Sequence, residues 1–178
     1  ILWFGNDDGN MVAYVPIYCS NTERAECFNT PGADAVTFSD KNAFWVCNWV
    51  SNMVYPRYSQ LFPALKEVRD SLDNAFLAAQ KGVEAKAESL YATDKAAAVK
   101  YLNDYSIQKS NEMIARWRQL AIHLIVKFND MAVKPEKDGK FLRTSTGLGE
   151  HVKRPGYSDY FKRELVKQTG DKFAVPNK

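Results

Sequence analysis

Two strongly apolar segments at the start of the chain constrain its fold more than any other feature. Leu2–Gly5 and Met11–Tyr18 flank a turn-forming Asn/Asp/Gly cluster at Asn6–Asn10, a pattern typical of two strands joined by a hairpin turn. In the second segment both alternating faces are largely apolar, so we expect a sheet that is covered on both sides. Pro16 cannot donate a ladder hydrogen bond, which predicts an edge position or a bulge.

The same apolar start bears on domain organisation. Chain termini tend to be polar and frayed, whereas this chain begins at Ile1 with a buried-looking strand. We therefore expect the chain to be the back part of a larger protein, whose N-terminal part is its main partner. Without that partner the strand edges and an apolar face would be uncovered, which predicts self-association through the exposed strand edges.

Composition narrows the classes of function. Of the 178 residues, 46% are hydrophobic and 25% are charged, which are ordinary values for a globular domain. The net charge of +3 is small and scattered, so a nucleic-acid partner is not expected. No apolar run approaches the roughly 20 residues that a membrane-spanning helix needs, so a membrane partner is not expected either.

The three cysteines and two histidines do not form a metal-binding pattern, because a zinc site needs four closely arranged nitrogen or sulfur ligands. A bound metal is therefore not expected. Cys19 and Cys27 are close enough in sequence either to form a disulfide or to remain separate thiols. A disulfide would indicate a periplasmic or secreted protein, and free thiols a cytoplasmic one. Cys47 falls in an apolar segment and is expected in the core.

The middle of the chain reads as helical. After a short third strand expected at Ala35–Phe38, Ser39 or Asp40 should cap a helix that is apolar nearly all round over Ala43–Val50. Pro56 should end or kink this helix. Two amphipathic stripes follow, and Gly82 is expected to interrupt the first before a further short helix starts at Thr93–Asp94. The first stripe covers Leu61–Ala79 and the second covers Ser106–Asn129.

The C-terminal part is dominated by turns and ends in one helix. Ser158 is expected to cap a helix over Asp159–Thr169 that Gly170 closes. The predicted fold class is therefore α+β, with strands in about residues 1–38, a helical region in about 40–130 and a turn/helix segment in 131–178.

Several phrases are too particular to be generic, and they occur in this order: Leu2–Asp8, Tyr14–Cys19, Glu26–Phe28, Ala43–Asn48, Arg57–Ser59 and Pro155–Asp159. Together they resemble the C-terminal part of the bacterial N-terminal-nucleophile (Ntn) cysteine dipeptidases, the family typified by the lactobacillal dipeptidases. The chain departs from the family pattern at Asn6, where an aliphatic residue is usual, at Ser20, where glycine is common, and at Cys47, where an aromatic residue is frequent.

The resemblance implies a partial αββα Ntn-hydrolase sandwich with a mainly helical excursion. It also implies hydrolysis of dipeptides, without a cofactor, by a cysteine that becomes the first residue after processing and whose own α-amino group accepts the proton. The cysteines of this chain are all internal, so we expect no catalytic residue here and no activity from the chain alone.

Three polar residues at the end of the first strand are the candidate substrate-binding residues. Asn6, Asp7 and Asp8 would wall the dipeptide pocket of the intact enzyme; alternatively, the two carboxylates serve the turn itself, as such pairs often do. Asn48, Asn52 and Arg57 could also contact a ligand or instead serve the structure. A rival reading of the whole chain is a non-enzymatic α+β binding or assembly module whose amphipathic helices form a docking arm.

Overall fold

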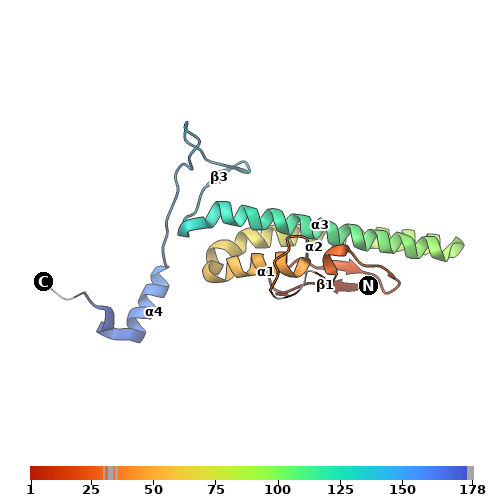
Figure 1. Cartoon of the computed structure of the whole chain (residues 1–178), viewed down its shortest axis with the longest axis horizontal. Helices are drawn as coiled ribbons and strands as arrows, with labels where there is room; N and C mark the ends of the chain where they lie inside the picture. Colours follow the sequence, from red (N-terminus) through yellow and green to blue (C-terminus); the bar gives the residue numbers. More distant parts are fainter. Residues whose placement is uncertain (30, 32–33, 35, 176–178) are drawn as a thin grey trace. The chain divides into compact units, whose positions relative to one another are not determined.

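The computed structural model describes residues 1–29, 31, 34 and 36–175 (Figure 1). The chain divides into two units, Ile1–Leu124 and Ile125–Lys178, each with its own internal contacts. Long helices and two small antiparallel sheets make up the described part, so the predicted α+β class is confirmed.

The first unit opens with an antiparallel strand pair, β1 (Leu2–Phe4) and β2 (Val15–Ile17), in which Trp3 lies opposite Pro16. Among the described residues this sheet has only these two strands, so the edge position predicted from Pro16 is confirmed. The second strand is shorter than predicted, because its first half belongs to the connecting loop. There the amide of Tyr14 donates to a side chain of a helix rather than to a neighbouring strand.

A loop and one turn of 3₁₀ helix, η1 (Glu26–Phe28), lead from the sheet to the first long helix. The third strand predicted at Ala35–Phe38 is wrong over Val36–Phe38, and Ala35 lies outside the described residues. Phe38 instead makes edge-to-face contacts with Trp45 and Trp49, with ring centroids 5.8 Å apart in both cases. These aromatic contacts offer the segment a packing partner that a lone strand would lack.

Helix α1 (Ala43–Val54) begins two or three residues later than its predicted caps suggest. The N-cap is Asn42, whose Oδ1 accepts from the amide of Phe44 at 2.9 Å, and not Ser39 or Asp40. Its own Nδ2 donates to the carbonyl of Asn29, so the amide serves both the helix and the loop before it. The helix ends before Pro56, as predicted, in the 3₁₀ turn η2 (Tyr55–Arg57).

Two long helices follow, α2 (Tyr58–Thr93) and α3 (Lys95–Phe128), and both are continuous where the sequence predicted breaks. Gly82 does not interrupt α2, since one helical glycine costs only about 1 kcal/mol relative to alanine. Burial of the next residue, Val83, helps to hold that turn in place. Asp94 both ends α2, through its amide, and caps α3, through Oδ1 to the amide of Ala97 at 3.0 Å.

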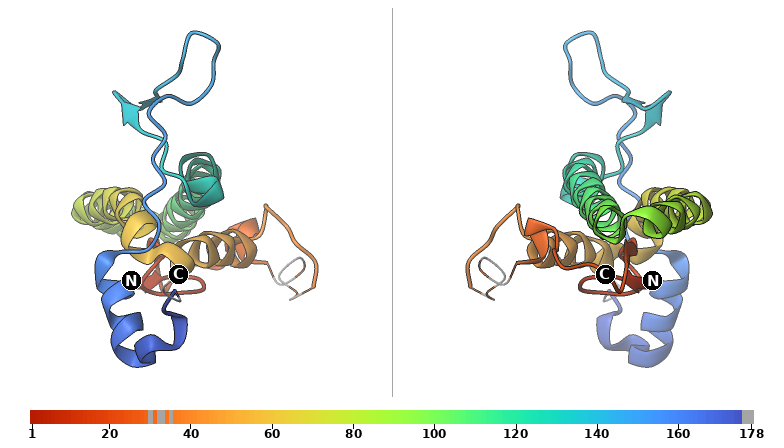
Figure 2. Two further views of the ribbon diagram at one scale, coloured as in Figure 1. Left: turned by 90° about the vertical axis from the view of Figure 1, so that its left-hand side faces the viewer. Right: turned by 90° about the vertical axis from the view of Figure 1, so that its right-hand side faces the viewer.

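The two long helices pack against each other in antiparallel fashion. Lys109 lies over the ring of Phe76 with Nζ 5.4 Å from its centroid, and Lys86 lies over Tyr101 at 4.7 Å, so positions later in α3 meet positions earlier in α2. In the end-on views of Figure 2, α1 and the strand pair lie on one side of these helices. The buried core that results includes Val15, Val46, Val50, Leu65, Phe76, Met113 and Trp117.

The second unit contains a short hairpin and one helix. Strands β3 (Glu136–Lys137) and β4 (Lys140–Phe141) are joined by Asp138 and Gly139, both at positive φ, as a tight hairpin turn requires. Helix α4 (Asp159–Thr169) has the predicted Ser158 cap, and the C-cap Gly170 is at φ 55°. Among the described residues, none of the helices is both long and apolar enough to cross a bilayer.

Candidate functional site

The predicted substrate-binding residues lie in the loop between β1 and β2, and Asp7 fastens this loop to α1. Ser51 donates from Oγ to Asp7 Oδ2 at 2.7 Å, and Asn48 donates from Nδ2 to Asp7 Oδ1 at 3.1 Å. Asn48 and Ser51 are three residues apart and therefore share one face of the helix. Asp7 has φ 69°, a left-handed conformation that aspartate tolerates better than most residues. Both of its carboxylate oxygens are thus committed to the fold.

Asp8 shapes the loop from inside. Its Oδ1 accepts from the amide of Asn10 at 2.9 Å, which is the local turn chemistry that aspartate commonly provides. Its Oδ2 accepts from the hydroxyl of Tyr55, just beyond the end of α1, and its carbonyl accepts from the amide of Met11 at 2.8 Å. The turn interpretation of the two carboxylates therefore has direct support in the geometry.

Asn6 differs from its two neighbours. Its side chain is half-buried, and among the described residues it has no hydrogen-bond partner. The amide does not figure among the buried polar groups that lack a partner, so solvent reaches it. Of the three candidates, Asn6 alone keeps both a donor and an acceptor free for a ligand.

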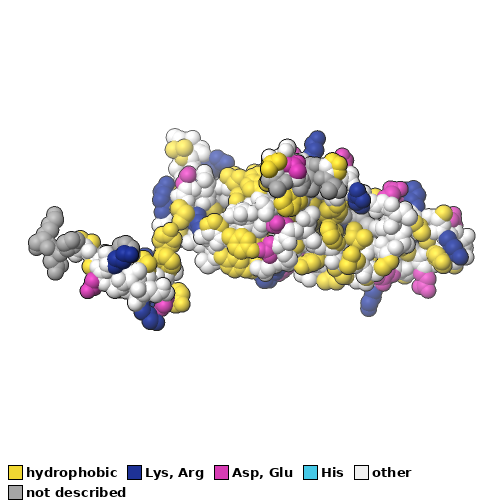
Figure 3. Space-filling model, turned by 60° about the horizontal axis from the view of Figure 1, so that its bottom comes forward, with side chains coloured by type: hydrophobic (Ala, Val, Ile, Leu, Met, Phe, Trp, Pro, Cys, Tyr) yellow, Lys and Arg dark blue, Asp and Glu magenta, His cyan; other side chains and the backbone are white. Residues whose placement is uncertain are grey.

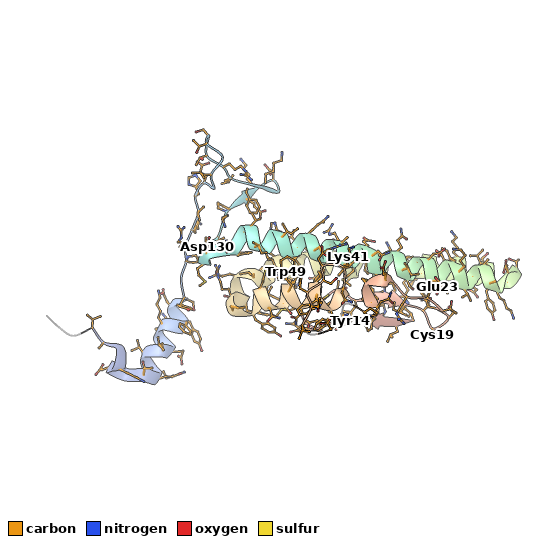
Figure 4. All side chains as sticks on the ribbon, viewed as in Figure 1. Tyr14, Cys19, Glu23, Lys41, Trp49 and Asp130 are labelled. Atoms are coloured by element: carbon orange, nitrogen blue, oxygen red, sulfur yellow. The ribbon has the colours of Figure 1, made fainter. Side chains whose placement is uncertain are left out.

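The other side of the loop is held by α2. Arg69 donates to the carbonyl of Asn10 at 2.8 Å, and the side-chain amide of Asn10 donates to the hydroxyl of Tyr58 at 3.1 Å. The amide of Tyr14, a residue labelled in Figure 4, donates to Asp73 Oδ1 at 2.9 Å. Two helices thus brace a loop that the sequence suggested was an independent turn.

Asp73 is half-buried, and its surroundings perturb its carboxyl group. Burial raises its pKa above the ordinary value, and this rise is only partly offset by the hydrogen bond from Tyr14 and by the charge of Arg69. It also lines a small apolar cavity of about 240 Å³ together with Trp3, Tyr14 and Leu77. Nothing in the sequence near Asp73 signals this role, because its partner lies 59 residues away.

The remaining polar candidates have structural partners. Asn52 donates to the carbonyl of Asn48 at 2.8 Å, within the same helix. Arg57 donates from Nε to Gln60 Oε1 at 3.0 Å. His123 is half-buried on α3.

The cysteines do not form a reactive site. All three are free thiols, so the disulfide between Cys19 and Cys27 that the sequence left open is not formed. Burial raises the pKa of the Cys27 thiol to about 11, and it also raises the pKa of Cys47 far above the ordinary value. A thiol that stays protonated at neutral pH is a poor nucleophile. Among the described residues there is also no group of three or more His, Cys, Asp or Glu side chains placed to hold a metal ion.

This loop and most of its anchors fall within a segment that known proteins share. The segment of residues 1–71 matches the family model described as peptidase family C69. The match confirms, at the level of the family, the relationship that the sequence phrases predicted. No curated protein and no solved structure matches the chain.

The C69 segment contains the strand pair, the whole Asn6–Asn10 loop, all of α1 and the first turns of α2. Of the side chains that brace the loop, only Asp73 lies beyond its end. The arrangement described above therefore lies mostly in the part of the chain that matches the C69 family model. The long remainder of α2, α3 and the second unit lie outside the match.

Proposed function

We propose that this chain is the C-terminal portion of a dipeptidase whose nucleophile, an N-terminal cysteine, lies outside it. The match of residues 1–71 to peptidase family C69 carries the proposal. The internal positions of Cys19, Cys27 and Cys47 agree with it, because none of them has the free α-amino group that such a mechanism uses as its base. In the reaction the thiolate attacks the dipeptide carbonyl, the C-terminal amino acid leaves, and water then releases the other from the acyl-enzyme.

In this proposal β1 and β2 extend one sheet of an αββα sandwich whose other strands come from the N-terminal part of the same protein. Support comes from the exposure of the first strand: Ile1 is 42%, Leu2 58% and Phe4 38% exposed, although all three are apolar. Hydrophobic side chains also gather on the face of residues 1–124 shown in Figure 3. Exposed apolar strands and open edges are typical of surfaces that pair with further strands.

The loop at the end of β1 would wall the dipeptide pocket. Asn6 is the residue proposed to contact the dipeptide, since its amide can both donate to a carbonyl oxygen and accept from an amine. Asp7 and Asp8 act in this scheme by holding the loop, through α1 and Tyr55, so that Asn6 is presented in one position. A preorganised polar group of this kind orients a substrate without an entropic cost at the moment of reaction.

The experiment compares this chain with a longer protein that includes the sequence encoded upstream of Ile1. We expect the longer protein to split Ala-Ala and this chain alone to be inactive. In the longer protein, Asn6→Ala should lower kcat/KM by roughly tenfold, the effect of losing one hydrogen bond to a polar substrate group. Asn52→Ala is the matched control, because that exposed amide bonds only to its own helix, and it should leave kcat/KM within about twofold of the unmodified protein.

Two results would overturn the proposal at different levels. Hydrolysis of Ala-Ala by this chain alone, with contaminating proteases excluded, would disprove an external nucleophile. Equal kinetics for the Asn6→Ala and Asn52→Ala proteins would leave the dipeptidase assignment standing and remove Asn6 from the pocket.

A further inference from the structure

A second cavity, of about 790 Å³, lies between the η1 loop, the start of α1 and the middle of α3. Its volume is within the range of roughly 300–1,000 Å³ in which small-molecule sites fall. Three of its lining residues, Cys27, Asn42 and Ile114, are each at most 5% exposed, and we call them the floor of the cavity. The loop, α1 and α3 therefore enclose a preformed hollow rather than a gap between mobile side chains.

The rim of this cavity is cationic. It is lined by Arg24 from the loop before η1, by Lys41 from the turn before α1 and by Arg118 from α3 (Lys41 is labelled in Figure 4). Glu26 is the one carboxylate among the described residues that line it. Cations that converge from separate parts of the chain are costly unless something neutralises them, because like charges repel at short range. On the exposed faces of the helices, by contrast, lysines pair with carboxylates, as Lys100 does with Asp104.

The three cations are available to a ligand. Within the described part of the chain, neither the side chain of Lys41 nor that of Arg118 makes an ion pair or a hydrogen bond. Arg24 donates from Nε to Asn29 Oδ1 at 2.8 Å, and its two terminal nitrogens have no hydrogen-bond partner among the described residues. The charge of Arg118 reaches the floor, where it offsets part of the rise in the pKa of Cys27 that burial causes.

We propose that this cavity binds a ligand bearing two or more carboxylates, held by Arg24, Lys41 and Arg118 over the floor of Cys27, Asn42 and Ile114. The guanidinium groups would take carboxylates in the paired geometry that arginine favours. The side-chain amide of Asn111, which also lines the cavity, can complete the polar contacts. Such a ligand could be a stretch of acidic peptide or a small polycarboxylate, and both present the same chemistry to the rim.

Isothermal titration calorimetry of the 178-residue chain with tri-glutamate, citrate and tri-lysine tests the proposal. We expect tri-glutamate, citrate or both to bind, tri-lysine to show no binding, and affinity to fall as salt is raised because exposed charges are screened. Binding of tri-glutamate alone would identify a peptide ligand, and binding of citrate alone a small polycarboxylate. Equal binding of both would show that the carboxylate groups themselves suffice.

The variants locate the binding. Arg118→Gln should weaken the affinity on the order of tenfold, as expected for loss of one charge-assisted contact. Arg116→Gln is the matched control, because it removes the same charge from the same helix. Arg116 is exposed and lies two residues from Arg118, so its side chain points roughly 200° around α3 from that of Arg118. It should change the affinity less than about twofold. Should Arg118→Gln fail to fold, the exposed Lys41→Gln substitution makes the same test.

A direct readout from the floor completes the design. Bound ligand should slow the alkylation of Cys27 by iodoacetamide while leaving that of the exposed Cys19 unchanged. The proposal is overturned if neither tri-glutamate nor citrate binds, if tri-lysine binds as well as tri-glutamate, or if Arg116→Gln weakens binding as much as Arg118→Gln. None of these outcomes depends on dipeptidase activity, so the test is independent of the function proposed above.

Discussion

The fastening of the β1–β2 loop to α1 by Asp7 can be tested by a graded set of substitutions. Asp7→Ala removes the acceptors for Ser51 and Asn48 and places a β-carbon without a polar group at φ 69°. Ser51 is only 2% exposed, and its 2.7 Å contact with Asp7 is a short charge-assisted hydrogen bond. The contact between Asn48 and Asp7 is exposed to solvent and therefore weaker. We assign about 1–1.5 kcal/mol to the two together, allowing for solvent screening of Asp7.

The backbone contributes separately. Alanine in the left-handed region costs about 1 kcal/mol more than glycine, which adopts it freely. We therefore expect Asp7→Ala to lower the free energy of unfolding by about 2–2.5 kcal/mol, and Asp7→Gly by about 1–1.5 kcal/mol. Asp7→Asn should cost less than either, because asparagine tolerates this conformation and keeps one acceptor oxygen.

Urea denaturation followed by tryptophan fluorescence measures these differences in the first unit, since all four tryptophans lie in it: Trp3, Trp45, Trp49 and Trp117. A double-mutant cycle of Asp7→Ala with Ser51→Ala should give a coupling free energy of about 1 kcal/mol. Equal stability of the alanine and glycine variants would refute the backbone part of the reasoning. Coupling below about 0.3 kcal/mol would refute the fastening by Ser51.

Two further predictions concern Cys27 and Gly82. With a pKa of about 11, the Cys27 thiol is ionised to only about one part in a thousand at pH 8. In the unliganded native chain, iodoacetamide should therefore modify the exposed Cys19 first. Peptide mass mapping measures both rates, and modification of Cys27 as fast as that of Cys19 would contradict the burial of Cys27. Gly82→Ala should raise the free energy of unfolding by about 0.5–1 kcal/mol, because alanine favours a helix more than glycine does. The added β-carbon meets no atom within 4 Å, so no clash opposes this gain. A fall in the urea midpoint would show that the glycine is needed there.

The sequence predicted those features that depend on short-range chemistry. Pro56 ended α1 because it cannot continue the hydrogen-bond ladder. Ser158 capped α4 as predicted, because a hydroxyl at that position accepts the free amide of Phe161. In each case every atom involved lies within a few residues, so the pattern in the sequence contains the whole interaction.

The predictions that were wrong depended on distant contacts or on competition between signals. Asn42 displaced Ser39 and Asp40 as the cap of α1, since its amide also satisfies the carbonyl of Asn29. Gly82 does not break α2, because the packing free energy lost in a break would exceed the helix-propensity cost of one glycine.

For the candidate site, the sequence located the polar loop but not its supports. The partners of Asp7 lie 41 and 44 residues away, and the carboxylate that holds Tyr14 lies 59 residues away. The sequence pattern does not indicate the cationic cavity for the same reason, because Arg24, Lys41 and Arg118 are spread over nearly a hundred positions. The family relationship came from particular phrases and not from any of this geometry.

The one-residue connection at Asp94 limits how this molecule can change in length. Asp94 alone connects α2 to α3, so no flexible loop can absorb a change in length. Inserting or deleting a single residue near this junction turns α3 by about 100° about the helix axis. The apolar stripe of α3 then points away from α2. The pair can grow or shrink only by matched additions of about seven residues to each helix, two turns at a time. Homologous chains should therefore differ here in whole steps, with both arms altered together.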